Sequence, residues 1–401
     1  MLSNRQLFLA NTAQTSDSPR LIEIDRAEGV YLYGPNGEQY IDLVSGFAVS
    51  NIGHRHPRVL EAIAAQLDRF LHVTVYGEFV QAPQVALAAG LLAVLPGRFD
   101  SVYFTNSGTE ATEGAMKIAK KFTGRRQIIA AEKAYHGSTQ GALSLIGNPE
   151  YQQAYAPLLP EIDFIRYNNH SDIAKIDTST AAVILEAVQG EAGIRVPDLS
   201  YMHAVRKRCD ETGTLLIFDE IQTGFGRTGR LFAFQHYGIE PDILLLAKGM
   251  GGGMPIGAFV ANKAVMDVIK DNPMLGHITT FGGHPVSCAA ALASLNVIIN
   301  EHLVDDVERK AQLFRQYLQH PAIREIRGIG LMLCIQLDTF EHVANVSKYC
   351  ADHGVIIDWF LHCATALRVS PPLIISDDEI EKACQVILNA LDHAGGQATE
   401  V

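Results

Sequence analysis

The sequence predicts an α/β protein with a mostly parallel central sheet, and three observations support this prediction. Helical and strand-like patterns alternate along most of the 401 residues. The strand-like runs are short and almost entirely apolar, as in strands that helices cover on both faces. A hydrophobic content of 48% with 19% charged residues excludes a disordered chain, and the length is sufficient for two or three domains.

The predicted elements follow in order along the first 250 residues. Apolar residues recur on one helical face over residues 61–71 and again over residues 110–122. Between the helices lie apolar runs of strand length, which we expect to form the buried parallel strands. These runs begin at Ser101, Gln127, Ala181, Thr214 and Asp242.

The pattern changes after about Ser294. One long helical pattern over residues 295–318 leads into the strand-like run I-R-G-I-G-L-M-L-C-I-Q-L, and a last helix is expected from Asp377. This part of the chain predicts a separate, smaller α+β domain.

The charge and the cysteines exclude several classes of protein. The 32 basic and 44 acidic residues give a net charge of −12, which disfavours non-specific binding to nucleic acid or to anionic membranes. The six cysteines form no C-x-x-C pair, so reduced thiols are expected rather than disulfides or a zinc module.

The N-terminus lacks a signal-peptide core, and the longest apolar run, residues 85–95, falls short of the ~18 residues of a transmembrane helix. We therefore expect a soluble cytoplasmic protein.

The pair His54 and His56 precedes a proline and an expected helix. Because no third ligand lies nearby in the sequence, we interpret the pair as capping and packing residues and expect no metal.

Residues 214–257 carry the most informative chemistry. Asp219 ends one apolar run and Lys248 follows another, and open α/β sheets bind their ligands at such strand ends. Apolar surroundings lower the pKa of a lysine and expose a nucleophilic amine. A Schiff-base lysine and an acid that keeps a pyridine nitrogen protonated are the two parts that a pyridoxal phosphate site requires. Either residue alone is more often structural, but the pair followed by a glycine run favours the cofactor.

A second pattern in this segment points to another cofactor. Gly224, Gly226 and Gly229 form a literal G-x-G-x-x-G. A dinucleotide motif should open a helix directly after a strand, whereas four residues separate Asp219 from Gly224 here. We therefore reject a dinucleotide site.

The phosphate of a cofactor needs its own site. The segment S-V-Y-F-T-N-S-G-T-E is typical of a strand, a turn and a helix start, with Ser107, Gly108 and Thr109 at the turn. Amides and hydroxyls at a helix N-terminus fit a phosphate. An ordinary N-cap explains the segment, taken alone, equally well.

These motifs resemble those of the class III pyridoxal-phosphate aminotransferases, the group of ornithine, acetylornithine and 4-aminobutyrate aminotransferases. The resemblance covers residues 27–391 and is most specific in L-L-I-F-D-E-I-Q-T-G-F-G-R-T-G and A-K-G-M-G-G-G-M-P-I-G-A. It implies the fold-type-I architecture, in which residues 47–293 form a large cofactor domain with helices on both faces of the sheet. The small α+β domain would combine residues 1–46 and 294–401.

The resemblance also implies roles for single residues. Lys248 matches the lysine that binds the cofactor and moves the substrate proton, and Asp219 matches the acid on the pyridine nitrogen. Gln222 matches the amide near the phenolic oxygen, and Tyr135 the aromatic residue that stacks on the ring. Thr280 matches a threonine that reaches the phosphate of the neighbouring subunit, which implies a homodimer with shared active sites. The cofactor-binding residues expected in this way are Ser107, Gly108, Thr109, Tyr135, His136, Asp219, Gln222, Lys248 and Thr280.

Four residues concern the substrate. By the resemblance, Arg368 matches the arginine that binds the α-carboxylate of glutamate or 2-oxoglutarate, and a planar guanidinium suits that anion. Glu191 matches the glutamate that pairs with this arginine when an amine without that carboxylate enters. Ser138 stands where related enzymes usually have a second arginine, and Phe47 adds apolar character to a pocket-lining position. A small, less cationic pocket favours a diamine or another ω-amine.

We predict that the chain transfers an amino group from an ornithine-like, diamine or ω-amino-acid donor to a 2-oxo acid, with 2-oxoglutarate giving glutamate. The alternatives are the acetylornithine aminotransferase of arginine biosynthesis and a mutase or decarboxylase on the same scaffold. A catalytically silent cofactor-binding protein is disfavoured by the presence of Lys248.

Overall fold

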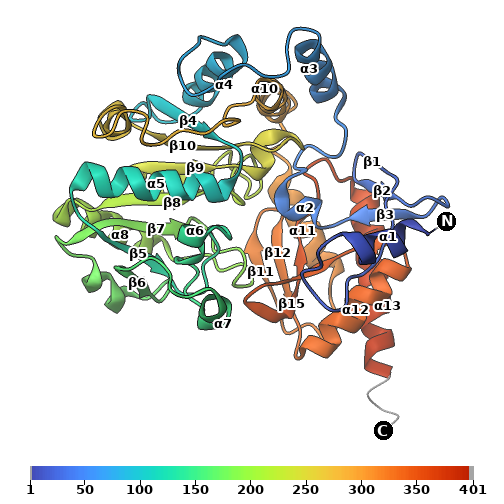
Figure 1. Cartoon of the computed structure of the whole chain (residues 1–401). Helices are drawn as coiled ribbons and strands as arrows, with labels where there is room; N and C mark the ends of the chain where they lie inside the picture. The colour runs from blue at the N-terminus through green and yellow to red at the C-terminus, as the bar shows by residue number, and fades with distance from the viewer. Residues whose placement is uncertain (1, 397–401) are drawn as a thin grey trace.

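The computed structural model describes residues 2–396, and its largest sheet has seven strands in the order β4-β10-β9-β8-β7-β5-β6 (Figure 1). The strands are β4 Ser101–Thr105, β5 Gln127–Ala131, β6 Ile162–Ile165, β7 Thr180–Glu186, β8 Leu215–Asp219, β9 Ile243–Leu246 and β10 Gly257–Ala261. Strands β9, β8, β7, β5 and β6 are mutually parallel, and only β10 runs antiparallel to its two neighbours. The predicted mostly parallel sheet is confirmed, and each predicted apolar run forms one of its strands.

Alternate residues of these strands enter two separate cores. On one face, Ile184 and Ile217 pack with Ala115 of helix α5, Gly108–Thr123. On the other face, Val183 and Leu216 belong to the core that includes residues of α4 Ala82–Ala93, α8 Leu199–Thr212 and α10 Pro285–Asn300. Because successive strand side chains point to opposite faces, an entirely apolar strand suits a sheet covered on both sides.

The second part of the molecule contains two four-stranded sheets (Figure 1). Their strands are β1 Arg26–Glu28, β2 Tyr31–Tyr33, β3 Gln39–Asp42 and β13 Val355–Ile356 in one sheet, and β11 Glu325–Ile329, β12 Met332–Gln336, β15 Cys363–Val369 and β14 Asp358–Phe360 in the other. Ile41 of β3 pairs in parallel with Val355 of β13 and shares its apolar core. Both ends of the chain therefore contribute to this part.

The remaining helices complete the molecule. They are α1 Asn4–Asn11, α2 Ser45–Ala48, α3 Pro57–Leu67, α6 Gln140–Leu143, α7 Pro149–Gln152, α9 Lys263–Met266, α11 Val307–Tyr317, α12 Phe340–Asp352 and α13 Asp377–Gly396. Across residues 2–396, no helix is both long enough and apolar enough to cross a bilayer.

The prediction of one helix over residues 295–318 is wrong. Helix α10 starts earlier, at Pro285, and ends at Asn300, and α11 begins only at Val307. His302 between them adopts a φ of 53°, in the left-handed region that commonly terminates helices.

Candidate active site

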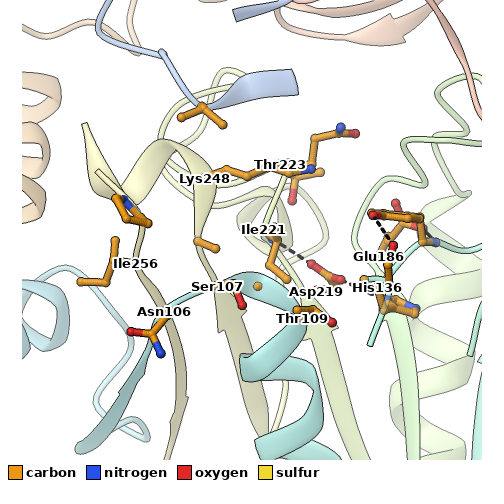
Figure 2. Close-up of a pocket in the computed structure, with 18 of the residues that line it drawn as sticks. Asn106, Ser107, Thr109, His136, Glu186, Asp219, Ile221, Thr223, Lys248 and Ile256 are labelled. Atoms are coloured by element: carbon orange, nitrogen blue, oxygen red, sulfur yellow. Dashed lines mark hydrogen bonds and ion pairs between the residues drawn. The ribbon is translucent and has the colours of Figure 1, made fainter. Parts of the chain in front are cut away.

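A cavity of about 510 Å³ lies at the carboxyl ends of β4, β7, β8 and β9 (Figure 2). Most of the residues predicted for the site line it. These are Ser107, Gly108, Thr109, Tyr135, His136, Ser138, Glu191, Asp219, Gln222 and Lys248. The structure thus brings together side chains from turns that are far apart in the sequence.

Asp219 is the last residue of β8 and is held by two hydrogen bonds (Figure 2). Its Oδ2 lies 2.7 Å from His136 Nδ1, and its Oδ1 accepts a bond from the Ile221 amide at 2.9 Å. Burial acts to lower the pKa of His136, but the hydrogen bond and charge of Asp219, with the charge of Glu186, outweigh it, so this pKa is raised. The contact with His136 fixes the orientation of the Asp219 carboxylate.

Lys248 follows β9 and starts the 3-10 helix η4, Lys248–Gly251. Its φ of 44° is left-handed, a backbone strain that is concentrated at functional sites. Burial lowers the pKa of the Lys248 amine, and although Glu191 opposes this effect, the net shift is downward. The amine is therefore easier to keep neutral and nucleophilic than an exposed lysine.

The turn before α5 caps this helix and also borders the cavity. Ser107 is the N-cap, and its Oγ accepts a hydrogen bond from the Glu110 amide at 3.3 Å. The amides of the first helical turn have no intrahelical partner, and Gly108 and Thr109 of this turn line the cavity. Gly108 packs so closely on Ile221 that a Cβ would lie 2.7 Å from its Cδ1.

Glu191 and Arg368 form a buried ion pair beside the cavity. Both carboxylate oxygens lie 2.7 Å from Arg368 Nη2, and Arg368 is only 2% exposed. The Leu361 amide adds a hydrogen bond to Glu191 Oε2 at 3.1 Å. Burial acts to raise the pKa of Glu191, but Arg368 and the charge of Lys248 outweigh it, so this pKa is lowered.

Tyr135 and Ser138 lie on the loop that follows β5. Ser138 is exposed at the cavity, and its Oγ lies 3.1 Å from Tyr135 Oη. The backbone amide of Tyr135 donates to Glu186 Oε1 at 3.1 Å.

Phe47, Arg368 and Thr280 lie outside the residues that line the cavity. The Phe47 ring instead covers the Arg368 guanidinium, with its centroid 5.1 Å from Cζ. Thr280 is exposed in the segment before α10, so the structure of one chain does not bring it into its own cavity.

The rejected motifs have structural roles. Gly226 and Gly229 adopt φ values of 91° and 83° in the loop after β8, which leads into a 3-10 helix at Ala233. His54 Nε2 lies 2.9 Å from Asp42 Oδ2, and His56 precedes α3 as its N-cap residue. Among the residues that the structure describes, no three His, Cys, Asp or Glu side chains gather as a metal site.

Sequence reasoning missed three polar residues of the cavity, Asn106, Glu186 and Thr223. Glu186 ends β7 directly opposite Asp219 in the strand register, and burial raises its pKa to about 7. Glu186 stands at the end of an apolar run, which is the same signal that identified Asp219. Asn106 immediately precedes the Ser107 turn and donates to Thr279 Oγ1 at 3.0 Å.

The cavity fits pyridoxal phosphate chemically. An amine of lowered pKa, a carboxylate at a strand end and a helix N-terminus suit the aldehyde, the pyridine nitrogen and the phosphate, respectively. Within the described residues, the buried atoms His136 Nε2 and Gln222 Oε1 have no hydrogen-bond partner. An unsatisfied buried polar atom is unusual in a folded protein and indicates space for a polar ligand.

Known proteins resemble this chain in sequence and structure. The family model for class III aminotransferases matches residues 12–391. An acetylornithine aminotransferase from Methanopyrus kandleri is 40% identical over 371 residues, which cover 92% of this chain and 94% of the relative. A putrescine aminotransferase from Pectobacterium atrosepticum is 39% identical over 387 residues, with 90% and 82% coverage.

The crystal structure of an ornithine aminotransferase from Toxoplasma gondii superposes with a TM-score of 0.91 at 31% identity, covering 99% of this chain and 97% of that one. This similarity confirms the predicted fold type, and the match to the family model confirms the resemblance that the motifs indicated. The chain belongs to the class III aminotransferases, which are pyridoxal-phosphate-dependent transaminases.

Proposed function

We propose that this aminotransferase takes its amino group from a diamine or another ω-amine and passes it to 2-oxoglutarate, giving glutamate. The observation that carries this proposal is the charge distribution at the cavity. Arg368 is buried beside the cavity and is already neutralised by Glu191, while the loop position of Ser138 offers only a hydroxyl. A donor with a carboxylate at the end far from its reacting amine would leave that charge unpaired, which is costly in a partly desolvated site.

The pair of Glu191 and Arg368 lets one site accept two unlike substrates. While Glu191 holds Arg368, the guanidinium is not free to bind a carboxylate, and the pocket admits an uncharged or amine-bearing chain. A 2-oxo acid displaces Glu191, and its carboxylate then takes the place of the Glu191 oxygens on the guanidinium. While it pairs with Arg368, Glu191 has a lowered pKa, and the 2-oxo acid therefore displaces a carboxylate.

Four groups of this chain would hold the cofactor and direct its chemistry. Lys248 Nζ would bind it covalently as a Schiff base, Asp219 would hold the proton on the ring nitrogen, and the Tyr135 ring would cover one face. The amides of the Gly108–Thr109 turn would bind the phosphate, because amides of the first helical turn have no intrahelical partner.

When bound, pyridoxal phosphate supplies an aldehyde and an electron-withdrawing ring. Lys248 Nζ would act as the base that accepts the proton from the reacting carbon of the donor, and as the acid that gives it back. Asp219 would keep its orientation towards the ring nitrogen, because His136 Nδ1 lies 2.7 Å from its Oδ2.

The proposal extends to a homodimer. Exposed apolar side chains gather on two neighbouring segments, residues 71–85 and 274–281, and parts of both segments line a groove of about 600 Å³. Phe79, Val80, Met274, Leu275 and Ile278 are each about half exposed or more. A second copy that covers this apolar groove would bring Thr280 of one chain towards the other chain's site.

We also propose the cofactor domain and the two-part small domain predicted above, and a cytoplasmic location. The shared core of β3 and β13 supports the domain division, and the free thiols of the six cysteines suit a reducing compartment.

A donor screen tests the proposed substrate class. Putrescine, ornithine, 4-aminobutyrate, lysine and N-acetylornithine are compared by kcat/KM with 2-oxoglutarate as acceptor. Putrescine or another ω-amine is expected to exceed N-acetylornithine, and Ser138→Arg should raise kcat/KM for N-acetylornithine by about tenfold or more, because a charged hydrogen bond contributes about 1.5–3 kcal/mol.

N-acetylornithine is the second candidate donor, favoured by the acetylornithine aminotransferases among the relatives. A strong preference of the unmodified enzyme for this donor would refute our interpretation of Ser138.

A further inference from the structure

Arg368 lies between two aromatic rings of very different exposure. Its Cζ is 4.5 Å from the centroid of the Phe360 ring and 5.1 Å from that of Phe47. Phe360 is 1% exposed and Phe47 is 42% exposed. The Phe360 ring is therefore a buried contact of Arg368, and the Phe47 ring is a contact at the surface.

Hydrogen bonds alone do not fix the guanidinium plane of Arg368. Both Glu191 oxygens contact the same nitrogen, Nη2, so the pair lacks the two parallel bonds of a bidentate geometry. Arg368 Nε is buried and has no partner among the described residues. Contact with an aromatic face can supply the missing orientation, because a guanidinium is attracted to the electron-rich face of a ring.

The segment that carries Phe360 also holds the other member of the pair. The Leu361 amide donates to Glu191 Oε2 at 3.1 Å, and the His362 amide donates to the Glu191 carbonyl at 3.0 Å. The pairing of β14 with β15 shifts register between Trp359 and Phe360, where a bulge changes the direction of a strand. Residues 360–362 therefore contact both Arg368 and its counterion.

We propose that Phe360 is a positioning residue that sets the affinity for the carboxylate-bearing substrate. Its ring holds the Arg368 guanidinium in the plane that a substrate carboxylate meets after Glu191 has left. This inference rests on the proposed carboxylate-binding role of Arg368. When Glu191 is displaced, Arg368 loses both of its hydrogen bonds at once, and the Phe360 face is then the contact that keeps it oriented.

The first test compares Phe360→Leu with Phe314→Leu, which alters an equally buried ring in the core shared by β3 and β13. In the holoenzyme, Phe360→Leu is expected to raise the KM for 2-oxoglutarate by about two- to thirtyfold, the range of a cation–π contact. The rate with butanal, an acceptor without a carboxylate, is expected to stay within about twofold of the unmodified enzyme. Phe314→Leu should leave both parameters unchanged.

A second measurement separates the electrostatics of the ring from its packing. Trifluorophenylalanine at position 360 withdraws charge from the ring face and changes its shape little. The KM for 2-oxoglutarate is expected to rise towards the value of Phe360→Leu, with an unchanged denaturation midpoint. An unchanged KM would show that Phe360 acts by packing alone and would overturn the inference.

Arg368→Leu keeps the two proposals distinguishable. If this change leaves the KM for 2-oxoglutarate unaltered, the carboxylate role of Arg368 itself fails. If it raises that KM while Phe360→Leu behaves like Phe314→Leu, only the positioning role of Phe360 is wrong.

Discussion

Lys248 has a strained backbone and a buried amine, and both are unfavourable for folding but useful for its reactivity. Its left-handed φ of 44° costs conformational energy, and its buried amine loses hydration. The left-handed backbone fixes where the side chain leaves the end of β9, and the desolvation favours the neutral amine. The glycines that follow, among them Gly252 with a φ of 59°, allow the chain to turn tightly there.

The lowered pKa of Lys248 predicts an unusual pH dependence of its reactivity. A lower pKa means that the neutral amine predominates from a lower pH upwards. In the apoenzyme, acylation of Lys248 by acetic anhydride should therefore reach its plateau at lower pH than acylation of Lys207, whose side chain is 78% exposed. Mass spectrometry of the labelled peptides measures both rates in one sample. Coinciding pH profiles would contradict the desolvated environment of Lys248.

At the scale of elements, Glu186 shows what the sequence could and could not predict. Apolar runs identified β7, β8 and β9, and a residue at a strand end is a visible signal. The register that places Glu186 beside Asp219 is not visible, because it depends on which strands become neighbours. Strand β10 was not predicted either, and neither was its place between β4 and β9. The break at His302 was missed because it depends on a single backbone angle within an otherwise helical pattern.

The loop after β7 gives a prediction at this scale. A Cβ at Gly190 would collide with Gln222 Oε1, so Gly190→Ala must displace the Gln222 side chain. Since Gln222 is proposed to lie near the phenolic oxygen of the cofactor, the absorption maximum of the bound cofactor should shift. Gly97→Ala is the matched control, because a Cβ at Gly97 meets no atom within 4 Å. The same spectrum in both variants would place Gln222 away from the cofactor.

At the scale of the whole molecule, Arg227 joins three distant segments. It is fully buried, its Nη2 donates to Asn51 Oδ1 at 2.5 Å, and its Nη1 donates to the carbonyls of Leu331 and Pro371. These bonds connect the loop after β8 to both the N-terminal and C-terminal parts of the chain.

Arg227→Met should lower the free energy of unfolding by about 3 kcal/mol or more, because buried acceptors lose their donor. Chemical denaturation of Arg227→Met and of Arg230→Met, which alters an exposed arginine nearby, measures the difference. Equal stabilities of the two variants would mean that Arg227 does not connect these segments energetically.

The apolar groove gives a prediction about assembly. Ile278, which is 49% exposed, lines this groove, and in a homodimer it would be buried. Ile278→Asp should therefore shift the mass in solution towards the monomer and lower cofactor affinity, whereas Leu199→Asp, at a site 55% exposed on α8, should not. Light scattering measures the mass. A monomeric unmodified enzyme, or an unaffected dimer in Ile278→Asp, would contradict the proposed interface.

Borohydride trapping tests the central claim, that Lys248 holds the cofactor in the cavity where β8 and β9 end. Reduction of the holoenzyme makes the Schiff-base link permanent, and peptide mass spectrometry then locates the attached cofactor. We predict the label on the peptide that contains Lys248, and no label at this position in Lys248→Ala. A label on a different lysine of the unmodified enzyme, or no trapped cofactor at all, would contradict the account.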